Sequence, residues 1–157
     1  MQKVTPCLWF DGQAEEAASF YVSVFKNSRM VSSTYYLEGS PGPAGSVMTV
    51  EFILDDVEFV ALNGGPQFAF SPAVSFVANC ETQDEVDRLW EELSEGGEEV
   101  QCGWLTDKYG VSWQVVPKAL RDMLSSADGA AAQRAFSAML GMKKLGSSAL
   151  QRAYEDV

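Results

Sequence analysis

The stretch of sequence that decides the fold is QCGWLTDKYGVSWQVVP, residues 101–117. It predicts a strand over residues 102–105, a polar turn over residues 106–108 and a second strand over residues 109–116. Because side chains on a strand point alternately to opposite faces, apolar residues gather on one face of the second strand. These residues are Val111, Trp113 and Val115. The opposite face presents the side-chain amide of Gln114, a polar group on a short and largely apolar strand.

A second hairpin is predicted over residues 46–63, with strands over residues 47–54 and 57–62. The two aspartates between these strands tolerate the dihedral angles of a two-residue turn. Such a closure predicts the cross-strand pairs Leu54–Val57, Phe52–Phe59 and Val50–Ala61. We expect this apolar face to pack on a helix, while the opposite face, which includes Glu51, is free to line a cavity or meet solvent.

Three further elements are predicted before this hairpin: a strand over residues 4–10, a helix over residues 13–25 and a strand over residues 30–36. Residues 38–45, EGSPGPAG, contain three glycines and two prolines and therefore predict an irregular loop. Such a loop either overhangs a binding cup or simply links two strands.

The same order of elements then recurs. A strand is predicted over residues 74–79 and a helix over residues 81–93, with Thr82 as its N-cap, before the hairpin of residues 101–117. Two copies of a strand-helix-strand-strand-strand unit, without a glycine-rich phosphate loop, favour paired modules in an α+β fold over a doubly wound fold.

The composition changes after the second copy. Helices rich in Ala, Met and Leu are predicted over residues 119–124, 129–142 and 148–154. The expected apolar stripe of the middle helix comprises Phe136, Met139 and Leu140. We expect this helical extension, residues 119–157, to pack against the rest of the chain or against a partner chain.

The composition excludes several classes of function. The net charge of −11 argues against nucleic acid and anionic membranes as partners. No apolar run approaches the roughly 20 residues that span a bilayer, and the N-terminal residues lack a signal-peptide pattern. Three widely spaced cysteines, Cys7, Cys80 and Cys102, predict free thiols, which suit a cytoplasmic protein.

The chain contains no histidine. This count removes the Ser-His-Asp and Cys-His catalytic arrangements and every metal site that depends on imidazole. Cys102, next to Gly103 and Trp104, is a candidate reactive thiol, but it has no histidine to lower its pKa and is better explained as a core cysteine.

The pattern Asp-x-Tyr-Gly-x-x-x-Gln, formed by Asp107, Tyr109, Gly110 and Gln114, resembles the closing strand of the vicinal oxygen chelate (glyoxalase/bleomycin-resistance/dioxygenase) superfamily. Together with the turn-helix segment DGQAEEAASFY and the segment ALNGGP, it resembles the PhnB-like branch of that superfamily. Some relatives in this branch are named 3-demethylubiquinone-9 3-methyltransferase.

The resemblance covers about residues 3–118 and implies two βαβββ modules that form a curved mixed sheet around a cup, and usually a homodimer. On this basis residues 1–118 form the paired-module domain, with modules at about residues 3–70 and 73–117. The family's metal ligands come from the first and last strands of each module. Here those positions include proline, alanine, serine and Gln114, so we expect no metal and no other cofactor.

Five residues are candidates for lining the cup: Glu51, Asn63, Ser75, Trp104 and Gln114. Gln114 either orients a ligand through its amide or is satisfied by the backbone. Glu51 is either a general base or a solvated carboxylate. Trp104 either stacks on a planar ligand or belongs to the core, and Asn63 also suits turn chemistry.

We expect a metal-independent protein of this superfamily that binds an unknown small molecule in the cup between the modules, and that forms a homodimer. Two alternatives stay open. One is an enzyme, either a lyase or isomerase that uses Glu51 as its base or a 3-demethylubiquinone methyltransferase. The other is a dimeric interaction protein whose cup is filled by its own side chains.

Overall fold

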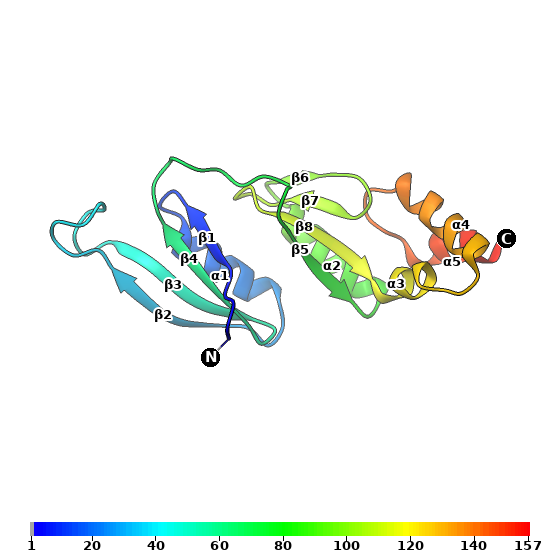
Figure 1. Cartoon of the computed structure of the whole chain (residues 1–157), viewed down its shortest axis with the longest axis horizontal. Helices are drawn as coiled ribbons and strands as arrows, with labels where there is room; N and C mark the ends of the chain where they lie inside the picture. Colours follow the sequence, from blue (N-terminus) through cyan, green and yellow to red (C-terminus); the bar gives the residue numbers. More distant parts are fainter. Residues whose placement is uncertain (1) are drawn as a thin grey trace. The chain divides into compact units, whose positions relative to one another are not determined.

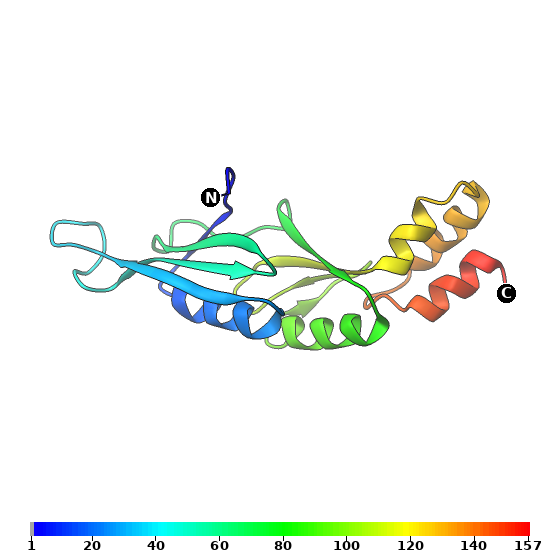
Figure 2. The same cartoon turned by 90° about the horizontal axis from the view of Figure 1, so that it is seen from below.

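The computed structural model describes residues 2–157, and their contacts form two compact units (Figure 1). The first unit ends at Phe70 and the second is Ser71–Val157. Each unit contains one four-stranded mixed sheet with a helix along one of its faces (Figure 2).

The sheet of the first unit has the strand order β1-β4-β3-β2, in which β1 and β4 are parallel and the other pairs are antiparallel. Its elements are β1 (Cys7–Phe10), α1 (Ala14–Val24), β2 (Arg29–Tyr35), β3 (Val47–Leu54) and β4 (Val57–Asn63). We call this the first sheet.

The sheet of the second unit repeats this path, with the order β5-β8-β7-β6 and a parallel pair β5–β8. Its elements are β5 (Ser75–Cys80), α2 (Gln83–Ser94), β6 (Glu98–Glu99), β7 (Trp104–Thr106) and β8 (Ser112–Pro117). We call this the second sheet. The repeated order confirms the predicted α+β fold of two βαβββ modules.

The hairpin β3–β4 has the predicted register, which pairs Leu54 with Val57, Phe52 with Phe59 and Val50 with Ala61. Both turn residues have positive φ, 45° at Asp55 and 67° at Asp56, as a tight hairpin turn requires. Apart from Val57, which is 44% exposed, the apolar face of this hairpin is buried under α1, where the ring of Tyr21 stacks on Phe52 with centroids 6.3 Å apart. The packing of the hairpin on the helix is therefore confirmed.

The hairpin β7–β8 is shorter than predicted, because β8 begins at Ser112 rather than at residue 109. The reason is the side chain of Asp107, whose Oδ1 accepts hydrogen bonds from the backbone N–H groups of Tyr109 (2.9 Å) and Val111 (3.0 Å). These bonds hold residues 107–111 in a loop, so that the backbone N–H groups of Tyr109 and Val111 are not available for strand pairing.

Three helices follow β8: α3 (Lys118–Leu124), α4 (Gly129–Leu140) and α5 (Ser147–Glu155). They enclose a small core of their own, made of Leu120, Met123, Ala135, Leu145 and Leu150. No helix within residues 2–157 is both long enough and apolar enough to cross a membrane.

The predicted apolar stripe of α4 is wrong in part. Phe136 and Leu140 are 40% and 51% exposed, and only Met139 packs against the helical core. The fully buried positions of α4 are Ala131 and Ala135. Small side chains allow close approach of neighbouring helices, so the alanine face, rather than the larger side chains, turns inward.

Candidate functional site

The side chain of Gln114 lies on the face of the second sheet that α2 does not cover. Its neighbours on the strand, Trp113 and Val115, are buried on the opposite face, against which α2 packs. Gln114 pairs with Trp104 on β7 and with Val77 on β5, so all three residues share this open face. We call it the open face of the second sheet.

Ser75 completes a polar group around Gln114. The Nε2 atom of Gln114 donates a hydrogen bond to Oγ of Ser75 over 3.0 Å. Ser75, Trp104 and Gln114 are all half-buried. The structure thus brings together three of the five residues that the sequence predicts as site residues, from three different strands.

The indole of Trp104 differs from the other three indoles of the chain in its hydrogen bonding. The indole N–H groups of Trp9, Trp90 and Trp113 donate to Gly65 O, Glu99 Oε1 and Asp107 Oδ2. No residue within 2–157 accepts a hydrogen bond from the indole N–H of Trp104, and none donates to Oε1 of Gln114. The open face therefore offers one free donor and one free acceptor beside the hydroxyl of Ser75.

Asn63 and Glu51 lie on opposite faces of the first sheet. Asn63 shares the parity of Phe59 and Ala61, which face α1, and its side chain joins three elements. Its Oδ1 accepts a hydrogen bond from the first backbone N–H of α1, that of Ala14, over 2.8 Å, and its Nδ2 donates to the carbonyl of Val47 over 3.1 Å. This amide supplies a cap that the N-terminus of α1 lacks locally.

Glu51 pairs with Val60 on the opposite face and is exposed. Its Oε2 accepts a hydrogen bond from the hydroxyl of Ser32 on β2 over 2.9 Å. The structure thus places Glu51 in a solvent-exposed position.

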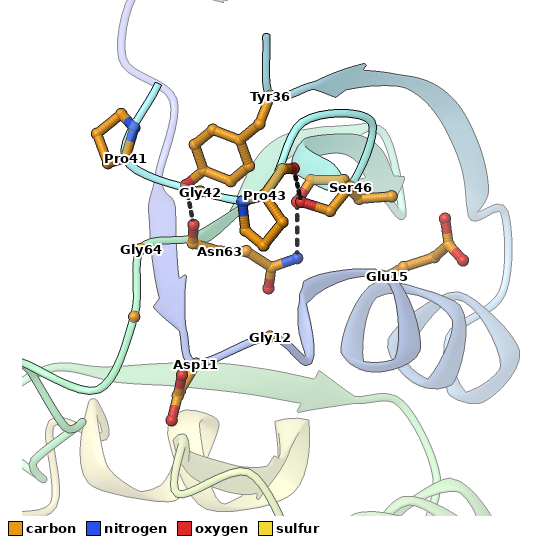
Figure 3. A pocket seen from close by; sticks show the side chains of 12 residues that line it. Asp11, Gly12, Glu15, Tyr36, Pro41, Gly42, Pro43, Ser46, Asn63 and Gly64 are labelled. Carbon is orange, nitrogen blue, oxygen red and sulfur yellow. Dashed lines mark hydrogen bonds between the residues drawn. The ribbon is translucent and has the colours of Figure 1, made fainter. Parts of the chain in front are cut away.

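A cleft of about 500 Å³ opens in the first unit at the N-terminal end of α1 (Figure 3). Its walls come from the turn after β1, the loop between β2 and β3, and the end of β4. They comprise Asp11, Gly12, Glu15, Tyr36, Pro41, Gly42, Pro43, Ser46, Val47, Asn63, Gly64 and Gly65. Part of the loop of residues 38–45, for which both a cup-covering role and a plain linker were left open, forms one wall of this cleft through Pro41, Gly42 and Pro43.

The polar groups of the cleft are largely engaged within the protein. The hydroxyl of Tyr36 donates to the backbone carbonyl of Asn63, and that of Ser46 donates to the carbonyl of Pro43 over 2.6 Å. The carboxylates of Asp11 and Glu15 point away from Tyr36 and Asn63 (Figure 3). Sequence reasoning missed Tyr36, whose only signal was its position directly before a loop rich in glycine and proline.

The three cysteines are free thiols, as predicted. Cys80 is buried under α2, and burial, followed by the negative charge of Glu85, raises its pKa to about 12. Partial desolvation also raises the pKa of the Cys7 thiol, although the residue as a whole is exposed. Cys102 is half-buried and has a positive φ of 61°.

The side chains around Gln114 include no negatively charged metal ligand. At the motif position of Gln114 the side chains offer an amide, a hydroxyl and an indole, which carry no negative charge. Within residues 2–157, no three His, Cys, Asp or Glu side chains gather closely enough to hold a metal ion.

Comparisons with known proteins agree with this architecture. The sequence model of the family described as 3-demethylubiquinone-9 3-methyltransferase matches residues 2–116. A PhnB protein of Bacillus cereus, described as a putative 3-demethylubiquinone-9 3-methyltransferase, is 39% identical, with a TM-score of 0.68 over 74% of this chain and 99% of its own. No curated protein was found to be similar to the chain.

More distant solved structures share the fold alone. Protein PA1353 of Pseudomonas aeruginosa is 23% identical, with a TM-score of 0.61 over 74% of this chain and 98% of its own. The fosfomycin resistance protein FosX of Listeria monocytogenes, in a complex with Mn(II) and sulfate, is 15% identical, with a TM-score of 0.57 over 80% of this chain and 100% of its own.

Proposed function

Because the chain belongs to the 3-demethylubiquinone-9 3-methyltransferase-like (PhnB) family of the vicinal oxygen chelate superfamily, we propose that it binds a small organic molecule without a metal of its own. The observation that carries this proposal is the free indole N–H of Trp104 beside the free Oε1 of Gln114. A half-buried donor and acceptor on neighbouring strands are well placed to orient a ligand.

The chemistry of the open face favours a neutral, flat ligand with polar edges. The indole ring offers a surface for stacking, while Gln114 Oε1 accepts a hydrogen bond and Trp104 Nε1 donates one. The net charge of −11 disfavours anionic ligands. A hydroquinone, whose hydroxyl groups both donate and accept, has these properties.

Metal independence is proposed from the donor set. With no histidine in the chain and an amide at Gln114, a divalent ion would meet only weak neutral ligands at this face. Calorimetric titration of the wild type with Mn²⁺ is expected to show no binding, and stoichiometric binding would contradict metal independence.

The test of binding is a calorimetric titration with a hydroquinone probe, demethylubiquinol without its prenyl tail. Gln114→Leu and Trp104→Phe each remove one hydrogen bond, so each is expected to weaken binding about tenfold. Gln133→Leu, a matched change at an exposed position of α4, is expected to leave the affinity unchanged. Unchanged affinity in both open-face variants, or binding that requires added Mn²⁺, would overturn the proposal.

A methyltransferase is the second candidate, favoured by the description of the matching family. In that reaction the methyl group of S-adenosylmethionine passes to a phenolic oxygen, whose proton goes to a base, and S-adenosylhomocysteine is released. The sequence has no glycine-rich strand-turn-helix of the Rossmann type for that cofactor. Two results would show that the protein is a methyltransferase rather than a binding protein. They are detection of the methylated probe by mass spectrometry and a pH dependence of the rate that Glu51→Gln abolishes.

We also propose that the chain is a homodimer in the cytoplasm. An outer strand of the first sheet, β2, exposes Met30, Val31 and Tyr35, and apolar outer strands invite pairing with another chain. Light scattering after size exclusion is expected to give twice the chain mass of 17.1 kDa. Val31→Lys is expected to reduce it to the single-chain value, and a wild-type monomer would contradict the dimer.

A further inference from the structure

Residues 142–147, which comprise most of the connection between α4 and α5 and the first residue of α5, contact the turn before β7, and we call them the strap. The strap and the three C-terminal helices lie beyond residues 2–116, the part of the chain that the family shares. The 74% of this chain that matches the Bacillus cereus relative accounts for 99% of that protein. The strap therefore lies outside the part of the chain that the family model matches.

The strap accepts hydrogen bonds from two successive residues that directly precede Trp104. The N–H of Cys102 donates to the carbonyl of Met142 over 2.7 Å, and the N–H of Gly103 donates to the carbonyl of Lys143 over 2.8 Å. Both residues have positive φ, 61° at Cys102 and 83° at Gly103. A cysteine rarely adopts this conformation, so the bonds to the strap favour a backbone turn that would otherwise be disfavoured.

Side-chain packing also holds the turn at Gly103 in place. Leu145 is 1% exposed and lies against Gly103, where a Cβ atom would come within 2.8 Å of Leu145 Cδ1. The carbonyl of Gly103 accepts a hydrogen bond from the N–H of Val115 over 2.8 Å, next to Gln114 on β8. The strap thus contacts the turn that leads into β7 at Trp104, and this turn is hydrogen-bonded to β8 beside Gln114.

A glutamine of α2 clamps the other side of the strap. Nε2 of Gln83 donates to the carbonyl of Leu145 over 3.0 Å, and Oε1 of Gln83 accepts from the N–H of Ser147 over 2.8 Å. Lys144 adds an ion pair with Asp87, also on α2, at 2.9 Å. These contacts tie the strap to a helix that lies on the opposite face of the sheet from Trp104.

We propose that the strap is a positioning element. It holds the turn at Cys102 and Gly103 and thereby sets the orientation of the Trp104 side chain on the open face. The effect of the strap on ligand binding rests on the proposed function. Its effect on the orientation of Trp104 does not, because that orientation can be measured without a ligand. Gln83 and Leu145 are positioning residues, because Gln83 holds the strap and Leu145 packs on Gly103.

The test uses Gln83→Leu in the full chain, with Gln151→Leu at an exposed position of α5 as the matched control. The indole N–H signals of the four tryptophans are recorded in a ¹H–¹⁵N spectrum, and the Trp104 signal is assigned from its loss in Trp104→Phe. In Gln83→Leu we expect a shift of the Trp104 signal and hydrogen exchange at the amides of Cys102 and Gly103 that is about tenfold faster. The signals of Trp9, Trp90 and Trp113 serve as internal controls.

Unchanged amide exchange at Cys102 and Gly103 would overturn the proposal, as would equal shifts of all four indole signals. Leu145→Ala, which removes the packing on Gly103 from the strap side, is expected to give the same local pattern and protects the test against failure of one variant. If these signals respond but the wild type binds no hydroquinone probe, the proposed function fails and the positioning of Trp104 stands.

Discussion

Oδ2 of Asp107 accepts a hydrogen bond from the indole N–H of Trp113 over 2.9 Å, and both side chains are buried, at 2% and 4% exposure. The other carboxylate oxygen accepts from the backbone N–H groups of Tyr109 and Val111. The aspartate of the family motif thus shapes the loop before β8 and places Gln114 on its strand. The aspartate at this motif position therefore has a structural explanation that requires no ligand.

Asp107→Ala is expected to destabilise the fold by roughly 2–4 kcal/mol, because two buried donors and one part-buried donor lose their carboxylate acceptor. Asp107→Asn is expected to be destabilising as well, since its amide N–H₂ would face the indole N–H of Trp113. Trp113→Phe removes that second donor but also buried indole surface, so the double variant should lose less unfolding free energy than the sum of the losses in the two single variants. Urea unfolding measures all four variants, and additive losses would contradict the assignment.

Asn63 is expected to contribute to stability through the cap of α1. Asn63→Ala should cost about 1–2 kcal/mol, the usual value of a lost N-cap. Asn63→Asp keeps an acceptor for the N–H of Ala14, where the helix dipole favours negative charge, but loses the donor to Val47. The predicted order of unfolding free energies is wild type, then Asn63→Asp, then Asn63→Ala, and equal values would contradict the capping role.

Cys80 should resist alkylation in the native protein. Its pKa of about 12 leaves almost no thiolate at pH 8, and its side chain is 1% exposed. Iodoacetamide at pH 8, followed by peptide mass analysis, should modify Cys7 but leave Cys80 unmodified until urea is added. Modification of both residues at similar rates in the native protein would contradict the buried position of Cys80.

The ion pair between the strap and α2 predicts a pH dependence. Hydrogen bonds from Lys144 and then from Gln83 lower the pKa of Asp87 below its ordinary value of 3.8. Its contribution to stability is therefore complete above pH 3.8 and is lost as the pH falls through the lower, folded-state value. The melting temperature of the wild type should exceed that of Asp87→Asn at pH 6, and the difference should shrink below pH 3.8. A constant difference from pH 6 to pH 3 would argue against the pair.

Elements fixed by local pattern could be predicted from the sequence. The register of β3 and β4 followed from alternation and a two-residue turn, and Thr82 caps α2 because its partner, the N–H of Glu85, is only three residues away. Contacts between distant residues could not be predicted this way. The Asn63 cap joins residues 49 apart, and the clamp of Gln83 on the strap joins residues 62 and 64 apart.

The candidate site was predicted in part for the same reason. The parity of β8 identified Gln114, but only the pairing of β7 and β5 with β8 brings Trp104 and Ser75 beside it. Hydrophobicity alone misled in α4, where close helix packing buries Ala135 and leaves Phe136 exposed. Whether Glu51, Asn63, Ser75, Trp104 or Gln114 contacts a ligand stays a prediction.

The measurement that tests the central claim most directly is native mass spectrometry of the purified chain, without added metal. We predict a protein mass with a small organic adduct, absent in the Gln114→Leu, Trp104→Phe double variant, and no stoichiometric divalent metal. A wild-type mass that carries one divalent metal ion per chain after dialysis would contradict the account.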